Sequence, residues 1–235
     1  MTHSLPRCIF ENRNLKNHTY YRIGGSAKYF AEPKTDEELA EVSDFIRSRS
    51  LKYYVLGAGS NVLFSDQGFD GVILYVGKLN QELSRPIEGK LVAGCSILNI
   101  QLLRLCMKEG LRGLEFLVGI PGSVGGAVFM NAGTTLGEAK DVLESVTVFD
   151  LATKKTTNYS KENLFFEYRK QKFLGKNEII LTATFRTTPC DASSLQKEIQ
   201  DLLAKRKLAQ PIDKPSCGSV FKNPSATQFA WKLIA

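Results

Sequence analysis

The sequence lacks the features of several large classes of protein. No apolar stretch in its 235 residues reaches the ~20 residues of a membrane-spanning helix. The first residues, MTHSLPRCIFENRN, lack the long apolar core of a signal peptide. We therefore expect a cytoplasmic protein with no membrane partner.

Side chains that bind metal ions are also scarce. The chain has five cysteines and two histidines, and it contains no C-x-x-C pair. Zinc and iron–sulfur sites need such residues in clusters. We predict no metal site and expect the cysteines to be reduced thiols in a reducing compartment.

Arginine-rich blocks and ladders of basic and aromatic residues are absent as well. The formal net charge is nevertheless +7, and the basic residues are scattered along the chain. Scattered charge favours small phosphorylated ligands in a positive cleft over nucleic acid. With 43% hydrophobic residues, the chain is long enough for one large globular domain or two small ones.

Hydrophobic periodicity predicts an α+β fold. Thr35 and Glu38 form a capping-box pattern, Ser96 is expected to cap a second helix, and Gly110 to end it. The order of the elements favours α+β subdomains over a doubly wound sheet, with a boundary near 187–192. Helices are expected at 35–49, 96–109 and 193–206; strands at 52–57, 71–77, 90–96, 145–150 and 178–185; and a polar turn at 151–160.

A first glycine cluster lies in VLGAGSNVLFSD, residues 55–66. Gly57 and Gly59 follow a strand, but Val62 stands where a dinucleotide-binding turn has its third glycine, and no helix follows. No G-K-[ST] sequence occurs, which excludes a P-loop. The segment is either a turn whose backbone N–H groups bind an anion or a plain tight turn.

A second cluster, LEFLVGIPGSVGGAVFMNAG at residues 114–133, combines glycine with large apolar side chains. One interpretation is a loop of bare backbone against a flat, partly apolar ligand. The other is a buried crossing of two chain segments. A weaker third cluster lies in NHTYYRIGGSAKYF, residues 17–30. Together the three clusters suggest one long ligand, and adenine, pyrophosphate and a flavin ring would fit.

Five motifs occur in order: YRIGG, LGAGSNVL, the 114–133 segment, EYRKQKF and PSCGSVFKNP. From about Asn17 onward the chain resembles the UDP-N-acetylenolpyruvoylglucosamine reductases, flavoenzymes of peptidoglycan precursor synthesis. The resemblance implies an FAD-binding fold of the vanillyl-alcohol-oxidase (PCMH) type. Residues 1–188 would bind FAD, as subdomains of about 1–77 and 78–188. Residues 189–235 would begin the substrate-binding domain.

The resemblance also implies a reaction. Non-covalently bound FAD would accept a hydride from NADPH at N5, and the hydride would pass to C3 of the enolpyruvyl group of a UDP-sugar nucleotide. A proton added at C2 would complete UDP-N-acetylmuramate. We expect a monomer with no nucleic-acid partner.

The resemblance carries residue roles onto matching positions. Arg169 would pair with the enolate oxygens, since a guanidinium stays charged throughout. Ser219 would donate the proton, with Lys222 or Arg169 stabilising the alkoxide, and Lys222 and Asn223 would bind substrate. Without the resemblance, Arg169 reads as a surface arginine and Ser219 as a turn residue. The FAD-binding residues would be Gly57, Ala58, Gly59, Ser60 and Asn61 at the pyrophosphate, and Gly122, Ser123, Gly125, Gly126 and Ala127 at the flavin.

The sequence departs from the family pattern at its end. The family usually continues further and supplies a late glutamate to the acid-catalytic site, a role that no position here receives. A truncated, impaired or non-catalytic FAD-binding protein is therefore an alternative. A second alternative is a flavin oxidoreductase of the same fold acting on an alcohol or sugar, and a basic nucleic-acid binder ranks last.

Overall fold

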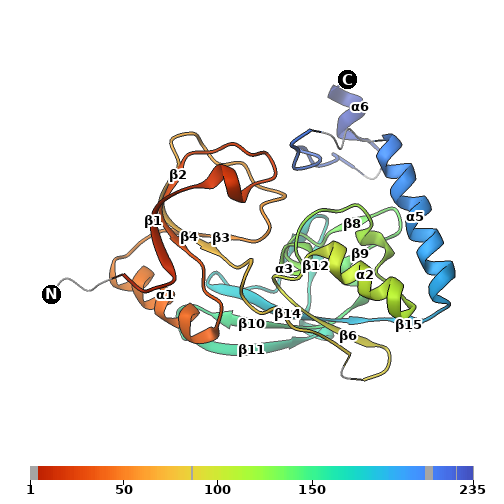
Figure 1. The fold of residues 1–235 in the computed structure, drawn as a ribbon, viewed down its shortest axis with the longest axis horizontal. Coiled ribbons are helices and arrows are strands. Elements are labelled where there is room, and N and C mark those ends of the chain that lie inside the picture. Colours follow the sequence, from red (N-terminus) through yellow and green to blue (C-terminus); the bar gives the residue numbers. More distant parts are fainter. Residues whose placement is uncertain (1–4, 86, 210–213, 226, 235) are drawn as a thin grey trace.

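The computed structural model describes residues 5–85, 87–209, 214–225 and 227–234. Two sheets form its framework (Figure 1). In the first sheet β1 pairs antiparallel with β2, whereas β2, β4 and β3 run parallel. Its strands are, in spatial order, β1 (Ile9–Asn14), β2 (Ser26–Ala31), β4 (Phe69–Tyr75) and β3 (Tyr53–Leu56).

The second sheet is antiparallel throughout. Its strands are, in spatial order, β11 (Lys155–Ser160), β10 (Leu143–Asp150), β14 (Glu178–Arg186), β6 (Lys90–Gly94) and β5 (Leu83–Ser84). Short two-stranded pairs complete the structure: β7 (Leu111–Arg112) with β15 (Thr188–Pro189), β8 (Gly133–Thr134) with β9 (Gly137–Glu138), and β12 (Phe166–Glu167) with β13 (Lys170–Gln171).

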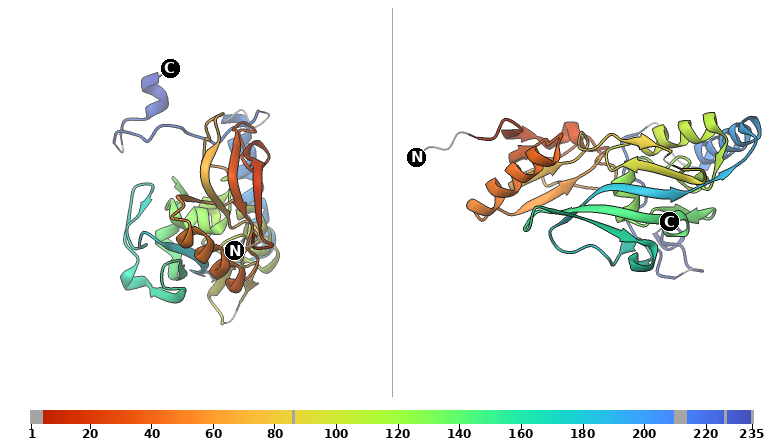
Figure 2. Two further views of the ribbon diagram at one scale, coloured as in Figure 1. Left: turned by 90° about the vertical axis from the view of Figure 1, so that its left-hand side faces the viewer. Right: turned by 90° about the horizontal axis from the view of Figure 1, so that it is seen from below.

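Helices pack around these sheets. The α-helices are α1 (Asp36–Ser48), α2 (Asn99–Glu109), α3 (Val124–Phe129), α4 (Ala139–Val142), α5 (Ala192–Ala209) and α6 (Ala230–Ile234). Three 3₁₀ turns are η1 (Leu15–His18), η2 (Glu115–Leu117) and η3 (Lys161–Asn163). In the right-hand view of Figure 2, α1 lies at one end of an elongated molecule and α5 at the other. No helix in the described ranges is both long and apolar enough to span a membrane.

The predicted helix at 35–49 is confirmed with its cap. Thr35 Oγ1 accepts a hydrogen bond from the Glu38 N–H at 3.2 Å, and the Glu38 carboxylate accepts one from the Lys34 N–H at 2.7 Å. Gly110 ends α2 with φ +61°, as predicted. The left-handed region that this requires is open to glycine at little steric cost.

Two local predictions were wrong. Ser96 does not cap α2, because its hydroxyl donates to the Asn80 carbonyl oxygen at 2.8 Å and the helix begins three residues later. The expected polar turn at 151–160 is a turn only as far as Lys154; residues 155–160 form β11. This strand pairs on one side only and is mostly exposed, so polar side chains can occupy it without alternation.

One core joins the two sheets. Leu39, Val42 and Phe45 of α1 belong to the same buried cluster as Val148 of β10 and Ile179 of β14. The Ser43 hydroxyl donates to the Leu151 carbonyl oxygen across the same contact. The opposite face of the first sheet has a smaller cluster of its own, made of Leu15, Ala27, Phe30, Leu56 and Ile73. The sheets are thereby held as one body, with the glycine-rich turns between them.

Candidate active site

The first two glycine clusters lie against each other. A Cβ atom added to Gly57 would be 3.0 Å from Ser123 Oγ, and one added to Gly122 would be 2.8 Å from Ser60 Oγ. The Ser60 hydroxyl donates to the Pro121 carbonyl oxygen at 3.1 Å. The turn after β3 and the loop before α3 are therefore in close contact through their serine hydroxyls, although 61 positions separate Ser60 from Pro121.

The third cluster joins the same place. The Tyr20 N–H donates to the Gly59 carbonyl oxygen at 2.9 Å. Gly59 has φ +72°, and a Cβ there would overlap the His18 carbonyl oxygen. The segment after η1 thus covers the turn from its other side. All three glycine clusters meet at one site, as one long ligand would require.

The turn at residues 57–61 presents open backbone donors. Across the described ranges, the N–H groups of residues 58–61 donate to no protein acceptor. Successive N–H groups in a turn of this kind form a concave site for an anion. The arrangement fits a pyrophosphate.

The central motif combines both interpretations that the sequence left open. It is not a continuous loop, because residues 124–129 form α3. A Cβ on Gly125 would lie 2.9 Å from Cys95 Cβ, and the Gly125 N–H donates to the Cys95 carbonyl oxygen at 3.0 Å. Gly125 therefore serves a buried crossing of two segments. Gly126 is exposed, and a Cβ there would meet nothing nearer than Ser123 Oγ at 3.7 Å.

A buried hydroxyl points to a polar ligand at this site. Ser123 is only 2% exposed, yet its Oγ has no hydrogen-bond partner among the described residues. A buried polar group without a partner costs free energy. A flavin ring has polar edges that can satisfy such a group, so the unpaired hydroxyl, the bare backbone at Gly126 and the open donors of the 57–61 turn together fit an FAD site.

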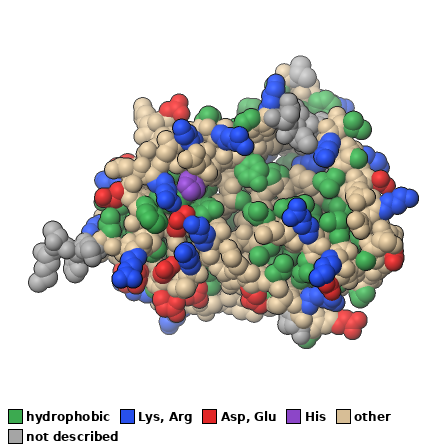
Figure 3. Space-filling view, in the orientation of Figure 1, with side chains coloured by type: hydrophobic (Ala, Val, Ile, Leu, Met, Phe, Trp, Pro, Cys, Tyr) green, Lys and Arg blue, Asp and Glu red, His purple; other side chains and the backbone are tan. Residues whose placement is uncertain are grey.

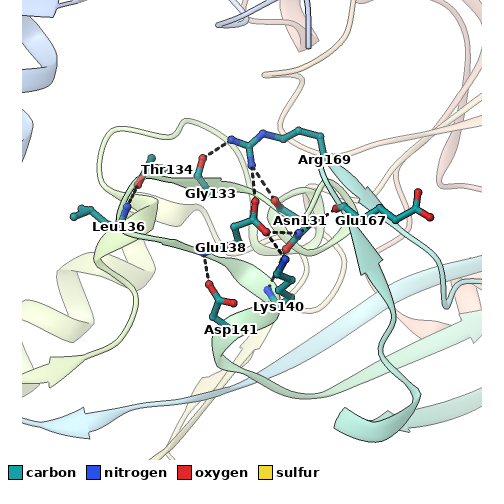
Figure 4. Close-up of polar contacts among 9 residues, drawn as sticks. All are labelled: Asn131, Gly133, Thr134, Leu136, Glu138, Lys140, Asp141, Glu167 and Arg169. Atoms are coloured by element: carbon teal, nitrogen blue, oxygen red, sulfur yellow. Dashed lines mark hydrogen bonds and ion pairs between the residues drawn. The ribbon is translucent and has the colours of Figure 1, made fainter. Parts of the chain in front are cut away.

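Arg169 is not a free surface side chain. It lies in the tight turn between β12 and β13 with φ +56°, and its side chain is 29% exposed. The guanidinium donates to the carbonyl oxygens of Asn131 and Gly133 at 3.2 and 2.7 Å (Figure 4). Glu138 Oε1 lies 3.7 Å from Nη1. A cation fixed in this way keeps its charge and remains accessible to an anion.

The other predicted substrate residues lie in the segment 214–225. Cys217 Sγ is 3.8 Å from the Gly59 carbonyl oxygen and 3.6 Å from that of Val62, which places this segment against the glycine-rich turn. Ser219 and Lys222 are exposed. The Asn223 amide oxygen accepts from the Ala230 N–H at 3.0 Å and so caps α6. Within the described ranges no hydrogen bond joins Ser219 to Arg169, whose partners are Asn131, Gly133 and Glu138.

The space-filling view shows a hollow between the two halves of the molecule, where hydrophobic side chains gather beside the C-terminal segment (Figure 3). Sequence reasoning did not assign roles to Asn131, Glu138 and Lys140, which surround Arg169. Asn131 belongs to the motif at 114–133, but its positive φ of +42° and complete burial are visible only in the fold.

Comparison with known proteins identifies the family. The profile of a family described as an FAD binding domain matches residues 27–158. The UDP-N-acetylenolpyruvoylglucosamine reductase of Chlamydia muridarum is 40% identical over 224 residues, which cover 95% of this chain and 74% of that protein. The chain belongs to the UDP-N-acetylenolpyruvoylglucosamine reductase family.

Solved structures of similar fold include a reductase of this family. The UDP-N-acetylenolpyruvylglucosamine reductase of Thermus caldophilus superposes with a TM-score of 0.78 at 33% identity, covering 95% of this chain and 78% of that one. A solvent-stable cholesterol oxidase shares the fold alone, with a TM-score of 0.55 at 15% identity over 77% of this chain and 37% of that one. The predicted α+β fold of the FAD-binding type is confirmed, and a reductase of this family is a flavoenzyme.

Proposed function

We propose that this chain is an NADPH-dependent flavoenzyme that reduces UDP-N-acetylglucosamine enolpyruvate to UDP-N-acetylmuramate. The reductases to which it is 33–40% identical carry this substrate in their names. The observation that carries the proposal is the meeting of three glycine-rich segments at one site, with open backbone donors and an unpaired buried hydroxyl.

The chain's own residues divide the work of binding the cofactor. The backbone of Gly57, Ala58, Gly59, Ser60 and Asn61 holds the pyrophosphate, and Gly122, Ser123, Gly125, Gly126 and Ala127 line the flavin. Gly126 offers bare backbone to the flavin, whereas Gly125 contributes indirectly, because it lets α3 pack against Cys95. When bound, FAD supplies a store for the hydride between oxidation of NADPH and reduction of the substrate.

Arg169 and Ser219 act on the enolpyruvyl group. A hydride added at C3 leaves an electron pair on C2, delocalised onto the adjacent carboxylate. The Arg169 guanidinium pairs with those oxygens because it stays protonated. Ser219 then gives its proton to C2, and Lys222 or Arg169 stabilises the alkoxide until a proton from water restores the hydroxyl. Lys222 and Asn223 also hold the sugar nucleotide.

The proposal includes the domain roles. Residues 1–188 bind FAD non-covalently, and residues 189–235 belong to the substrate-binding part. The contact of Cys217 with the 59–62 turn supports this division, because it brings the PSCGSVFKNP motif to the cofactor site. The protein acts as a monomer.

Two anaerobic half-reactions test the function. The purified protein with FAD is mixed with NADPH, and the visible flavin absorbance is followed; the enolpyruvyl sugar nucleotide is then added. The proposal predicts bleaching by NADPH and recovery of the colour by that substrate only. Bleaching without recovery contradicts the proposed reduction and supports an FAD-binding protein without this activity. Recovery with simple alcohol-derived ketones instead would identify a different oxidoreductase.

A further inference from the structure

Asn131 connects the two hairpins of the Arg169 site. Its side-chain Nδ2 donates to Glu138 Oε2 at 2.9 Å and to the Glu167 carbonyl oxygen at 3.2 Å. Its Oδ1 accepts from the Lys140 N–H at 3.1 Å, and its backbone carbonyl accepts from Arg169. One buried side chain therefore fixes the β8–β9 hairpin and α4 against the strand that leads into Arg169 (Figure 4).

Asparagine suits this position better than aspartate does. Both amide protons have acceptors, and an aspartate would have none to offer while placing a second carboxylate against Glu138. The backbone at Asn131 has φ +42°, a region that asparagine tolerates better than most residues. The side chain is completely buried, so water cannot replace a lost partner there.

Glu138 orients the guanidinium without cancelling its charge. Its Oε1 faces Arg169 Nη1 at 3.7 Å, whereas its Oε2 binds Lys140 Nζ at 2.9 Å. The Lys140 ammonium donates to this carboxylate, and the hydrogen bond raises the pKa of Lys140, so the lysine stays charged. Asp141 also lies in this group, because its Oδ2 accepts from the Glu138 N–H at 2.8 Å, so two cations face two carboxylates. Lys140 takes up one oxygen of Glu138, and the accessible Arg169 guanidinium can still attract a carboxylate ligand.

We propose that Asn131 and Glu138 are positioning residues that hold the Arg169 guanidinium toward the enolpyruvyl carboxylate. This inference rests on the proposed function. In this inference both residues act through Arg169, to which they are joined by the Asn131 carbonyl oxygen and by Glu138 Oε1. A displacement of about 1 Å at such a group can slow a reaction by about 100-fold.

The test compares Asn131→Asp with Asn12→Asp. Asn12 is exposed on β1 and also has a positive φ, of +53°, so it controls for the same change in a similar backbone conformation. Asn131→Asp should leave reduction of the flavin by NADPH within about twofold and slow reoxidation by substrate about 10- to 100-fold. Asn12→Asp should leave both half-reactions unchanged. Equal slowing of both half-reactions by Asn131→Asp would overturn the inference.

A double-mutant cycle separates positioning from general structural damage. If Asn131 acts through Arg169, Asn131→Asp should have no further effect in an Arg169→Ala background. Additive losses would contradict the inference. Glu138→Gln keeps the shape of the side chain and removes its charge, so it should also slow reoxidation of the flavin by substrate. This second variant tests the inference if Asn131→Asp lowers the thermal midpoint of the protein.

A readout without substrate distinguishes the inference from the proposed function. In ¹H–¹⁵N spectra, the Arg169 Nε–H of the parent protein should give a distinct signal, assigned by its loss in Arg169→Lys. The signal should broaden or move to the solvent-averaged position in Asn131→Asp and Glu138→Gln. If the parent shows no substrate turnover but this change occurs, positioning stands and the proposed function fails. An unchanged signal in both variants overturns the positioning.

Discussion

At the scale of single residues, neighbouring glycines of the central motif have different tasks. The Gly125 N–H donates to the Cys95 carbonyl oxygen, and a Cβ on Gly125 would press on the Cys95 side chain. A Cβ on exposed Gly126 would make only an ordinary contact with Ser123 Oγ at 3.7 Å. Gly125 is thus a packing residue, whereas Gly126 is the residue that we propose for contact with the cofactor. Substitutions at the two positions separate these tasks.

Gly125→Ala should destabilise the fold by about 1–3 kcal/mol, because the new methyl group is forced against Cys95. Gly126→Ala should leave the fold unchanged or stabilise it by up to about 1 kcal/mol, as alanine favours the helix. The same Gly126→Ala change should weaken FAD binding about tenfold or more. Urea unfolding of the apoprotein and FAD titration measure the two effects. If Gly126→Ala binds FAD as tightly as the parent, the flavin does not lie against that backbone.

Gly59→Ala tests the first glycine turn. The alanine would have to adopt φ +72° with its Cβ in the space of the His18 carbonyl oxygen. We expect a loss of at least about 2 kcal/mol in the free energy of unfolding, together with weaker FAD binding. Urea unfolding of the apoprotein measures the loss of stability, and FAD titration measures the loss of binding. A Gly59→Ala variant as stable as the parent would show that the turn is not packed in this way.

Ser219→Ala tests the proton donor of the proposed reaction. Without the hydroxyl, reoxidation of the flavin by substrate should slow by about 100-fold or more, the usual contribution of a positioned acid. Reduction by NADPH should be unchanged, because the serine is exposed and its proposed role begins only when the substrate is reduced. Rapid mixing under anaerobic conditions measures both steps. Equal loss in both steps would assign Ser219 a structural role instead.

At the scale of elements, the cap of α1 offers a prediction independent of the cofactor. Thr35 Oγ1 accepts the Glu38 N–H, which otherwise lacks a partner within the helix. Thr35→Ala should cost about 1 kcal/mol in the free energy of unfolding, and Thr35→Ser should restore most of it. Denaturant midpoints of the three proteins check this. If Thr35→Ala were as stable as the parent, water would have to replace the threonine hydroxyl as the acceptor for the Glu38 N–H.

Regular elements were predictable where local chemistry decides them. The helix from Thr35 and the stop at Gly110 follow from capping and left-handed backbone, which are properties of a few adjacent residues. Ser96 was misjudged because its hydroxyl has a tertiary partner, Asn80, 16 positions away. The strand β11 was missed because an exposed edge strand needs no alternating apolar residues.

The site was predictable only in outline. The glycine clusters could be found from composition, but their meeting depends on contacts such as that of Ser60 with Pro121. The role of Arg169 was assigned from the resemblance. Its guanidinium is held in place by the carbonyl oxygen of Asn131, 38 positions earlier in the chain. No pattern of neighbouring residues predicts this hydrogen bond, because it forms only when two short hairpins pack side by side.

At the scale of the whole molecule, three buried thiols report on the integrity of the core. Burial raises the pKa of Cys8 to about 11 and those of Cys95 and Cys106 to about 12. All five cysteines are free thiols, and Cys190 and Cys217 are only partly buried. Brief alkylation of the native protein near pH 8 should label the latter two and spare the others until unfolding. Mass spectrometry of the labelled peptides provides the measurement, and native labelling of Cys95 or Cys106 would contradict this packing.

The same thiols predict how stability depends on pH. Their folded-state pKa values lie above the unfolded value of 9.0, so the folded chain binds more protons at alkaline pH. Their contribution is fully present below pH 9 and is lost as pH rises toward 12. Cys106→Ala should make the fall in unfolding free energy between pH 9 and pH 10.5 shallower, which urea titrations at both pH values can measure. A parent protein equally stable at both would contradict this.

The central claim is that backbone left bare by glycine binds FAD between the two sheets. Equilibrium titration of the apoprotein with FAD, followed by flavin fluorescence, tests it most directly. The account predicts saturable binding of one FAD per chain, weakened by Gly126→Ala while the fold remains intact. A folded protein whose titration shows no saturable binding would contradict it.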